Sequence, residues 1–109
     1  MADSFDDRRK GFEEKFRMDQ ELQFKVLSRR DKLLGMWFGE KLGLSGQPLS
    51  DYAGSVIAAA VQKPGDDDVV SKIMTDVARH NIGVTEAEIR TKLAELAQTA
   101  KSQIDAELK

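Results

Sequence analysis

The chain has 109 residues, with 17 basic and 19 acidic side chains and a formal net charge of −2. This size suits one domain with a modest core, and the balanced charge argues against a nucleic-acid binder, which carries a basic excess on one face. The absence of cysteine excludes disulfides, thiolate metal sites and cysteine nucleophiles. The first ten residues hold no apolar signal core. The longest apolar run, residues 33–39, is too short for a bilayer, which takes about 20 residues, so we expect no direct membrane insertion.

A long helix is predicted first, over residues 16–42. Its apolar side chains fall on two neighbouring stripes, one of Leu22, Val26, Leu33 and Trp37 and one of Phe16, Phe24, Leu27, Leu34 and Phe38. Together the stripes cover roughly half of the helix circumference, more than an ordinary amphipathic stripe. We therefore expect this helix to be the central one of a small bundle, packed against two or three neighbours. Gly35, Gly39 and Gly43 recur at helical steps and predict a strip where another helix approaches closely.

Two shorter helices are predicted next. The second helix opens at Pro48, which suits a first helical turn, and its light apolar face consists of Tyr52, Val56, Ala59 and Ala60. The third opens at the acidic residues 66–68, which favour the positive end of a helix dipole, and its inner stripe consists of Val69, Ile73 and Val77. Asn81 and Gly83 suit its end, because both tolerate the left-handed conformation.

The last helix is predicted from Thr85, which forms a capping box with Glu88. An apolar stripe at three- and four-residue steps follows, made of Ile89, Leu93, Leu96, Ala100 and Ile104. No sustained period-2 alternation predicts a strand. The predicted fold class is therefore all-α, a four-helix bundle with a long first helix and a flexible or partly helical N-terminal segment. We divide the chain into that segment, residues 1–18, expected to be disordered when free, and a helical bundle domain over residues 19–109.

The N-terminal segment has an unusual composition. More than half of residues 1–32 are charged, with nine basic and eight acidic side chains. On a helix, Phe5, Phe12 and Phe16 lie within about 40° of each other. Three aromatic side chains cannot order so charged a stem alone, so the segment either folds back onto the bundle or binds a partner in the helix-in-groove mode. The alternative is a frayed, solvated helix extension whose phenylalanines close the end of the core.

No catalytic or metal site is predicted. His80 is the only histidine, and a partly buried or helix-capping position is favoured because no second ligand or nucleophile accompanies it. The acidic run 66–68 lacks the spacing of a calcium loop and is explained by a helix start. There is no GxxxxGK[ST] phosphate loop, and no carboxylate sits in an apolar run that would raise its pKa for acid chemistry.

Four stretches carry a further signal: Ser4–Arg8 (SFDDR), Phe12–Phe16 (FEEKF), Asp19–Lys25 (DQELQFK) and Arg29–Trp37 (RRDKLLGMW). They resemble the alphaproteobacterial ATPase inhibitor subunit zeta family, formerly a family of unknown function. Glu88-Ile89-Arg90 with Lys92-Leu93 looks like the C-terminal signature of that family. The resemblance covers nearly the whole chain.

The resemblance implies a four-helix bundle that binds the soluble catalytic head of the F-type rotary ATP synthase and inhibits its ATP hydrolysis. It implies that the N-terminal segment inserts as a helix at a catalytic alpha/beta interface, close to the gamma subunit. Carried over by position, the partner-binding residues are Phe5, Asp6, Asp7, Arg8, Phe12, Glu13, Lys15 and Phe16. The protein would be a non-enzymatic, cytoplasmic regulator, peripheral to the inner membrane through the ATP synthase and monomeric when free.

Departures from the family pattern bear on inhibitory strength. Met18 stands where the family usually has His, and Asp31 where it usually has Asn. Gly11 weakens a helix in the inhibitory stretch by up to about 1 kcal/mol. The resemblance implies that no cofactor is required. Some members of the family bind adenine nucleotide weakly on the bundle, so weak ATP or ADP binding at an unassigned site is expected. The alternative function is therefore a small adenine-nucleotide-binding or sensing bundle without inhibitor activity. A membrane-surface amphipath is disfavoured because acidic residues interleave with the basic ones.

Overall fold

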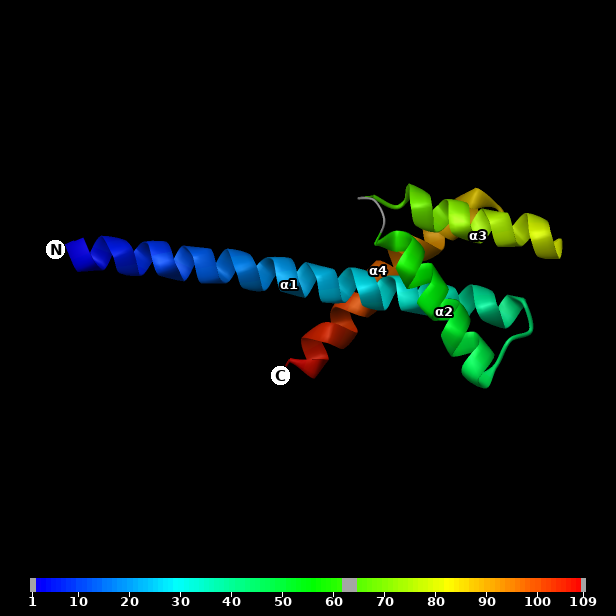
Figure 1. Ribbon diagram of the computed structural model, residues 1–109, viewed down its shortest axis with the longest axis horizontal. Helices are drawn as coiled ribbons and strands as arrows, with labels where there is room; N and C mark the ends of the chain where they lie inside the picture. Colours follow the sequence, from blue (N-terminus) through cyan, green and yellow to red (C-terminus); the bar gives the residue numbers. More distant parts are fainter. Residues whose placement is uncertain (1, 62–64, 109) are drawn as a thin grey trace.

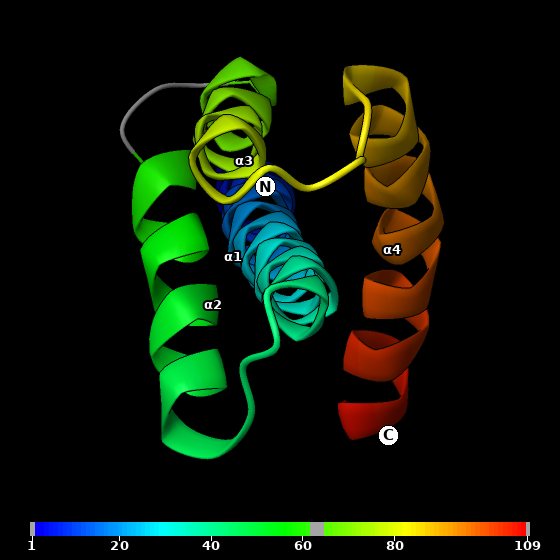
Figure 2. The ribbon, with the colours of Figure 1, turned by 90° about the vertical axis from the view of Figure 1, so that its right-hand side faces the viewer.

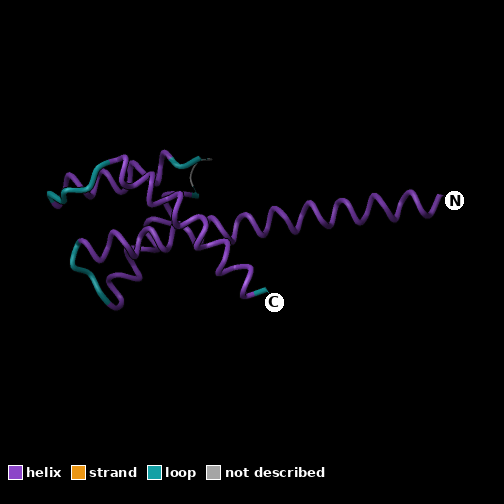
Figure 3. Tube along the Cα trace, turned by 180° about the vertical axis from the view of Figure 1, so that it is seen from behind, coloured by secondary structure: helices purple, strands orange, loops and turns teal. Residues whose placement is uncertain are grey.

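The computed structural model describes the backbone of residues 2–61 and 65–108, and the side chains of that part from residue 20 onward. These residues form four helices and no strand: α1 (Ala2–Lys41), α2 (Gly46–Ala60), α3 (Asp67–His80) and α4 (Glu86–Glu107) (Figures 1 and 3). The predicted all-α fold with four helices and a long first helix is confirmed. Helix α1 begins at Ala2, well before the predicted start at residue 16. The division of the chain at residue 18, and disorder of the first segment in the free protein, stay predictions.

Helix α1 is the centre of the bundle. Seen along its axis, it lies between α2 and α4, with α3 across one side of it (Figure 2). The N-terminal half of α1 projects beyond the other three helices (Figure 1), and the molecule measures 67 × 26 × 21 Å. The predicted central position of this helix is thus confirmed for its C-terminal half, which is the part that the shorter helices surround.

The core draws on all four helices and on Val84, which precedes α4. Its buried members are Leu34, Phe38, Val56, Val69, Val70, Ile73, Val84, Ile89 and Leu93. The aromatic ring of Phe38 packs at 6.4 Å from that of Trp37 and at 6.0 Å from that of Tyr52, between ring centroids. Most positions of the predicted inner stripes of α3 and α4 are buried as expected, with Leu96 and Val77 half-buried.

The helix ends follow the sequence signals. The Thr85 hydroxyl accepts a hydrogen bond of 3.1 Å from the Glu88 backbone N–H, as predicted for a capping box. Asn81 ends α3 in the left-handed conformation, with φ at 54°. Helix α2 begins at Gly46, so that Pro48 lies in its first turn. Helix α3 begins one residue after Asp66, with Asp67 and Asp68 in its first turn.

The predicted small-residue strip is where α1 and α2 meet. A Cβ atom placed on Gly35 would lie 2.7 Å from the Cα of Ala53, closer than real carbon contacts allow. A Cβ on Gly39 would lie 2.5 Å from the Leu49 Cδ1 atom, which a flexible side chain can move. Gly35 is therefore the position that lets the two backbones approach. Gly43 ends the strip in a different role, because it follows α1 with φ at 84°.

Replacement of Gly35 by alanine should lower the free energy of unfolding by about 1–3 kcal/mol, because overpacking against the α2 backbone outweighs the helix-propensity gain. Gly54→Ala is the matched control: it lies mid-helix in α2 with nothing within 4 Å of its added Cβ. That variant should gain up to about 1 kcal/mol. Urea unfolding of both variants measures the difference, and a gain for both would show that the α1–α2 contact is looser than described.

Candidate functional site

The predicted partner-binding residues lie on the projecting part of α1. The backbone of Phe5, Asp6, Asp7, Arg8, Phe12, Glu13, Lys15 and Phe16 is helical and stands clear of the bundle (Figure 1). Their side chains lie outside the described part of the chain, so the predicted roles of these eight residues stay predictions. The fold places all eight residues on α1, the same helix that forms the centre of the bundle.

Side chains are described from the point where α1 approaches the bundle. Phe24 is 63% exposed and Leu27 is 48% exposed, although both belong to a stripe predicted to pack against neighbouring helices. That prediction was wrong for these two residues, while Leu34 and Phe38 on the same stripe are fully buried. In this stretch of α1 the neighbouring stripe is better covered, since Leu22 and Val26 are half-buried and Arg29 bonds Gln103 and Glu107 of α4.

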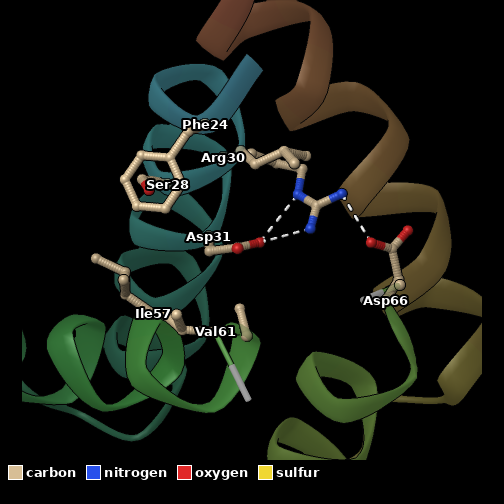
Figure 4. A pocket seen from close by; sticks show the side chains of 10 residues that line it. Phe24, Ser28, Arg30, Asp31, Ile57, Val61 and Asp66 are labelled. Atoms are coloured by element: carbon tan, nitrogen blue, oxygen red, sulfur yellow. Dashed lines mark hydrogen bonds and ion pairs between the residues drawn. The ribbon is translucent and has the colours of Figure 1, made fainter. Parts of the chain in front are cut away.

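An apolar pocket adjoins these exposed side chains. It has a volume of about 420 Å³, and its apolar walls are Phe24, Leu27, Ile57, Ala60 and Val61. We call this pocket the exit notch, because it lies where α1 leaves the bundle. Phe24 comes from α1, whereas Ile57 and Val61 come from the C-terminal end of α2 (Figure 4). The charged side of the notch is formed by Arg30, Asp31 and Asp66.

Arg30 bridges two carboxylates beside the exit notch (Figure 4). Its Nε donates to the Asp31 Oδ1 at 2.9 Å and its Nη2 lies 2.8 Å from the same oxygen. Its Nη1 lies 2.9 Å from the Asp66 Oδ1. Arg30 and Asp31 are buried, while the Asp66 side chain is 45% exposed. Burial raises the pKa of Asp31 above its usual value, against the opposing hydrogen bond and charge of Arg30.

A second buried carboxylate joins α2 to α3. The Tyr52 hydroxyl donates to the Asp76 Oδ2 at 2.7 Å, and the Lys72 Nζ lies 2.9 Å from the same atom. Burial alone would raise the pKa of Asp76, but the hydrogen bonds from Tyr52 and Lys72 and the positive charges of Lys72 and Arg79 outweigh it and lower the pKa. Each buried side-chain oxygen and nitrogen of the described residues has a partner, so neither network leaves a buried polar atom unpaired.

The sites weighed from sequence alone have structural explanations. His80 is exposed and is the last residue of α3. Of the two predicted positions for it, partial burial was wrong, whereas a position at a helix end agrees with the structure. Asp66 pairs with Arg30 and Asp67 with Arg90 at 3.1 Å, in keeping with a charged helix start. Among the described residues no group of three or more His, Cys, Asp or Glu side chains could hold a metal ion. None of the helices, as far as the chain is described, is long and apolar enough to cross a membrane.

Comparison with known proteins supplies the family. The family described as "ATPase inhibitor subunit zeta" matches residues 1–103, and thus the projecting part of α1 as well as the bundle. The chain belongs to the ATPase inhibitor subunit zeta family. A protein structure determined by solution NMR is similar to this zeta-family chain at 38% sequence identity and a TM-score of 0.70. The alignment covers 79% of this chain and 98% of that one. Among curated proteins none matches.

Membership of the zeta family confirms the resemblance drawn from the N-terminal motifs. It supports an inhibitor of an ATPase, with the ATP synthase as its partner and a regulatory rather than a catalytic role. Sequence reasoning missed the exit notch and both buried carboxylates of this zeta-family bundle. Only the burial of Asp76 could have been predicted from the sequence, because this residue follows Val69 and Ile73 at helical steps on the buried face of α3.

Proposed function

We propose that this zeta-family protein inhibits ATP hydrolysis by the F-type rotary ATP synthase, by inserting residues 1–18 at a catalytic alpha/beta interface of the soluble head, near the gamma subunit. The observation that carries the proposal is the extent of the family match, which includes the whole N-terminal segment. Inhibition would prevent the synthase from consuming ATP when the proton gradient fails.

The geometry of α1 suits insertion. Residues 2–19 form about 27 Å of helix at 1.5 Å per residue, and this length stands clear of α2, α3 and α4 (Figure 1). A groove can therefore enclose the segment without a clash with the bundle. The predicted stripe of Phe5, Phe12 and Phe16 offers aromatic anchors at helix-in-groove spacing. The surrounding charges would stay solvated or pair with the walls of the groove.

The rest of the proposal concerns what the protein is and where it acts. We infer a regulator that performs no chemistry, needs no cofactor or metal, and is monomeric when free. It would act in the cytoplasm, peripheral to the inner membrane through its contact with the alpha, beta and gamma subunits. No nucleic-acid partner is proposed, in keeping with the net charge of −2.

Deletion of residues 1–16 should abolish inhibition of the purified cognate ATPase head, because it removes all three phenylalanines of the inserted segment. The full chain at micromolar excess should inhibit ATP hydrolysis in the same assay. The truncated protein should keep the helical circular-dichroism signal of its bundle, since the core begins at Leu34. Inhibition by the truncated protein equal to that of the full chain, or none by the full chain, would contradict the proposal.

Weak adenine-nucleotide binding is the second candidate, and one arrangement favours it. Lys41 and Lys92 hold their Nζ atoms 5.0 and 5.8 Å from the centroid of the Trp37 ring. These two ammonium groups beside the half-buried ring are positive charges that the phosphates of a nucleotide could pair with. Titration with ATP and ADP followed by NMR shifts, with and without the ATPase head, separates a nucleotide sensor from an inhibitor.

A further inference from the structure

Three of the four large apolar side chains that are exposed in the described residues lie in the exit notch. They are Phe24 at 63%, Leu27 at 48% and Val61 at 65% exposure. The fourth, Leu108, is 60% exposed at the end of α4, outside the notch. Exposed apolar side chains that gather in one concave place, on two different helices, mark an interaction site more strongly than the same side chains scattered singly.

We propose that the exit notch is a second contact with the ATPase head, distinct from the N-terminal segment. It would receive an apolar side chain of the head that is flanked by a lysine or arginine. This inference rests on the proposed function, because the partner of the notch is the same ATPase head that is proposed to enclose residues 1–18. It assigns to the bundle a part in binding, and to α2 a docking role through Ile57 and Val61.

Continuity along α1 supports this occupant. At 100° per residue, Leu27 lies within about 60° of the stripe of Phe5, Phe12 and Phe16. The helix is unbroken between them, and Phe24 follows Phe16 after only about 12 Å of helix axis. A partner wrapped around residues 1–18 therefore meets the exit notch next, on a neighbouring part of the helix surface.

The charges of the notch indicate what the partner presents. Among the described residues that line the notch, Asp31 and Asp66 share the single guanidinium of Arg30, which leaves one net negative charge beside the apolar walls. Three of the five N–H groups of Arg30 are directed to these two carboxylates, which already balance its single positive charge. The Asp66 carboxylate, 45% exposed, can accept a hydrogen bond from a basic group that arrives at the rim.

A second contact would have a clear energetic use. Ordering a charged segment in a groove costs conformational entropy, and for an isolated peptide the contacts of the segment must offset the whole of this cost. A bundle that binds the head through its notch keeps the N-terminal segment at a high effective concentration near the groove of the head. The full chain should therefore inhibit more strongly than a peptide of residues 1–18, although both carry the same three phenylalanines.

Two measurements at position 61 test the proposal. A photoreactive amino acid at Val61 should crosslink to a subunit of the ATPase head, and one at Leu108 should not. Val61→Asn should raise the concentration for half inhibition about tenfold, since it removes one apolar side chain from the contact. Leu108→Asn, similarly exposed but just after α4 and not among the residues that line the notch, should leave it unchanged. Both positions are exposed enough for the variants to fold, which circular dichroism checks.

The outcomes separate this inference from the proposed function. If the full chain inhibits and the deletion of residues 1–16 does not, but Val61→Asn matches the wild type, the notch is not a docking site and the insertion stands. Equal crosslinking from positions 61 and 108, or none from 61, overturns the notch as well. A crosslinked product of two copies of this chain in the absence of the head would assign the notch to self-association instead. If the full chain does not inhibit, both proposals fail.

Discussion

Replacement of all three phenylalanines of the stripe by serine in one variant should abolish inhibition of the ATPase head at micromolar concentration. The positions changed are Phe5, Phe12 and Phe16. Each phenylalanine that becomes fully buried contributes about 1.5–3 kcal/mol. Loss of three would weaken binding by roughly 1,000-fold or more, at 1.4 kcal/mol for each factor of ten. The free energy of unfolding of the bundle should stay unchanged, because the core draws its α1 members from Leu34 and Phe38. Inhibition assays and urea unfolding measure the two quantities on the same samples.

A matched control is available on the opposite face of the same helix. At 100° per residue, Asp3, Lys10 and Glu14 cluster about 160° away from the phenylalanine stripe. Serine at these three positions changes the same number of side chains in the same segment, and it should leave most of the inhibition intact. Equal losses for the two triple variants would mean that the segment acts through its charge or its helicity, not through an aromatic face.

The elements of this fold could be predicted from the sequence because each signal is local. The capping box at Thr85, the left-handed end at Asn81 and the apolar stripes of α3 and α4 depend on residues a few positions apart. The same holds for Gly35, whose helical step to Gly39 predicted the close approach of another helix, which the structure identifies as α2. Periodicity identifies the face of a helix that is buried when a neighbour is present.

Periodicity does not show how far along a helix the neighbour extends. Phe24 and Leu27 continue the stripe of Leu34 and Phe38, and they are exposed although the end of α4 bonds Arg29 in the same stretch of α1. Burial of Arg30 and Asp31 was equally hidden, since residues 29–32 are all charged and are typical of a solvated face. Arg30 also pairs with Asp66, which lies at the start of α3 and reaches Arg30 only in the folded chain.

Replacement of Arg30 by methionine should lower the free energy of unfolding by about 3–5 kcal/mol at neutral pH, because it leaves the buried carboxylate of Asp31 without its partner. Arg90→Met is the matched control. Arg90 also pairs with an aspartate, at 3.1 Å, but its side chain is 46% exposed. Loss of that surface pair should cost less than about 1 kcal/mol. Similar, small losses for both variants would show that the Arg30 network is solvated.

A second substitution separates an unpaired charge from lost packing. In Arg30→Met with Asp31→Leu, apolar side chains occupy the site of the buried pair, an exchange that is often neutral or stabilising. The double variant should therefore recover most of the stability that Arg30→Met loses. If it does not, the guanidinium contributes mainly through its contacts with Asp66 and the start of α3.

The pH dependence gives an independent check on the same carboxylate. Burial already raises the pKa of Asp31 in the folded protein, and removal of Arg30 takes away the hydrogen bond and the charge that oppose this rise. A folded-state pKa above the unfolded value makes a contribution to stability that is fully present below the unfolded pKa and is lost as pH rises through the folded pKa. Arg30→Met should therefore be less destabilising at pH 4 than at pH 7, because the raised pKa of Asp31 favours its neutral form at the lower pH. Urea unfolding at the two pH values should show the gap to the wild type widening with pH, and a gap that stays constant would mean that Asp31 is not the group left unpaired.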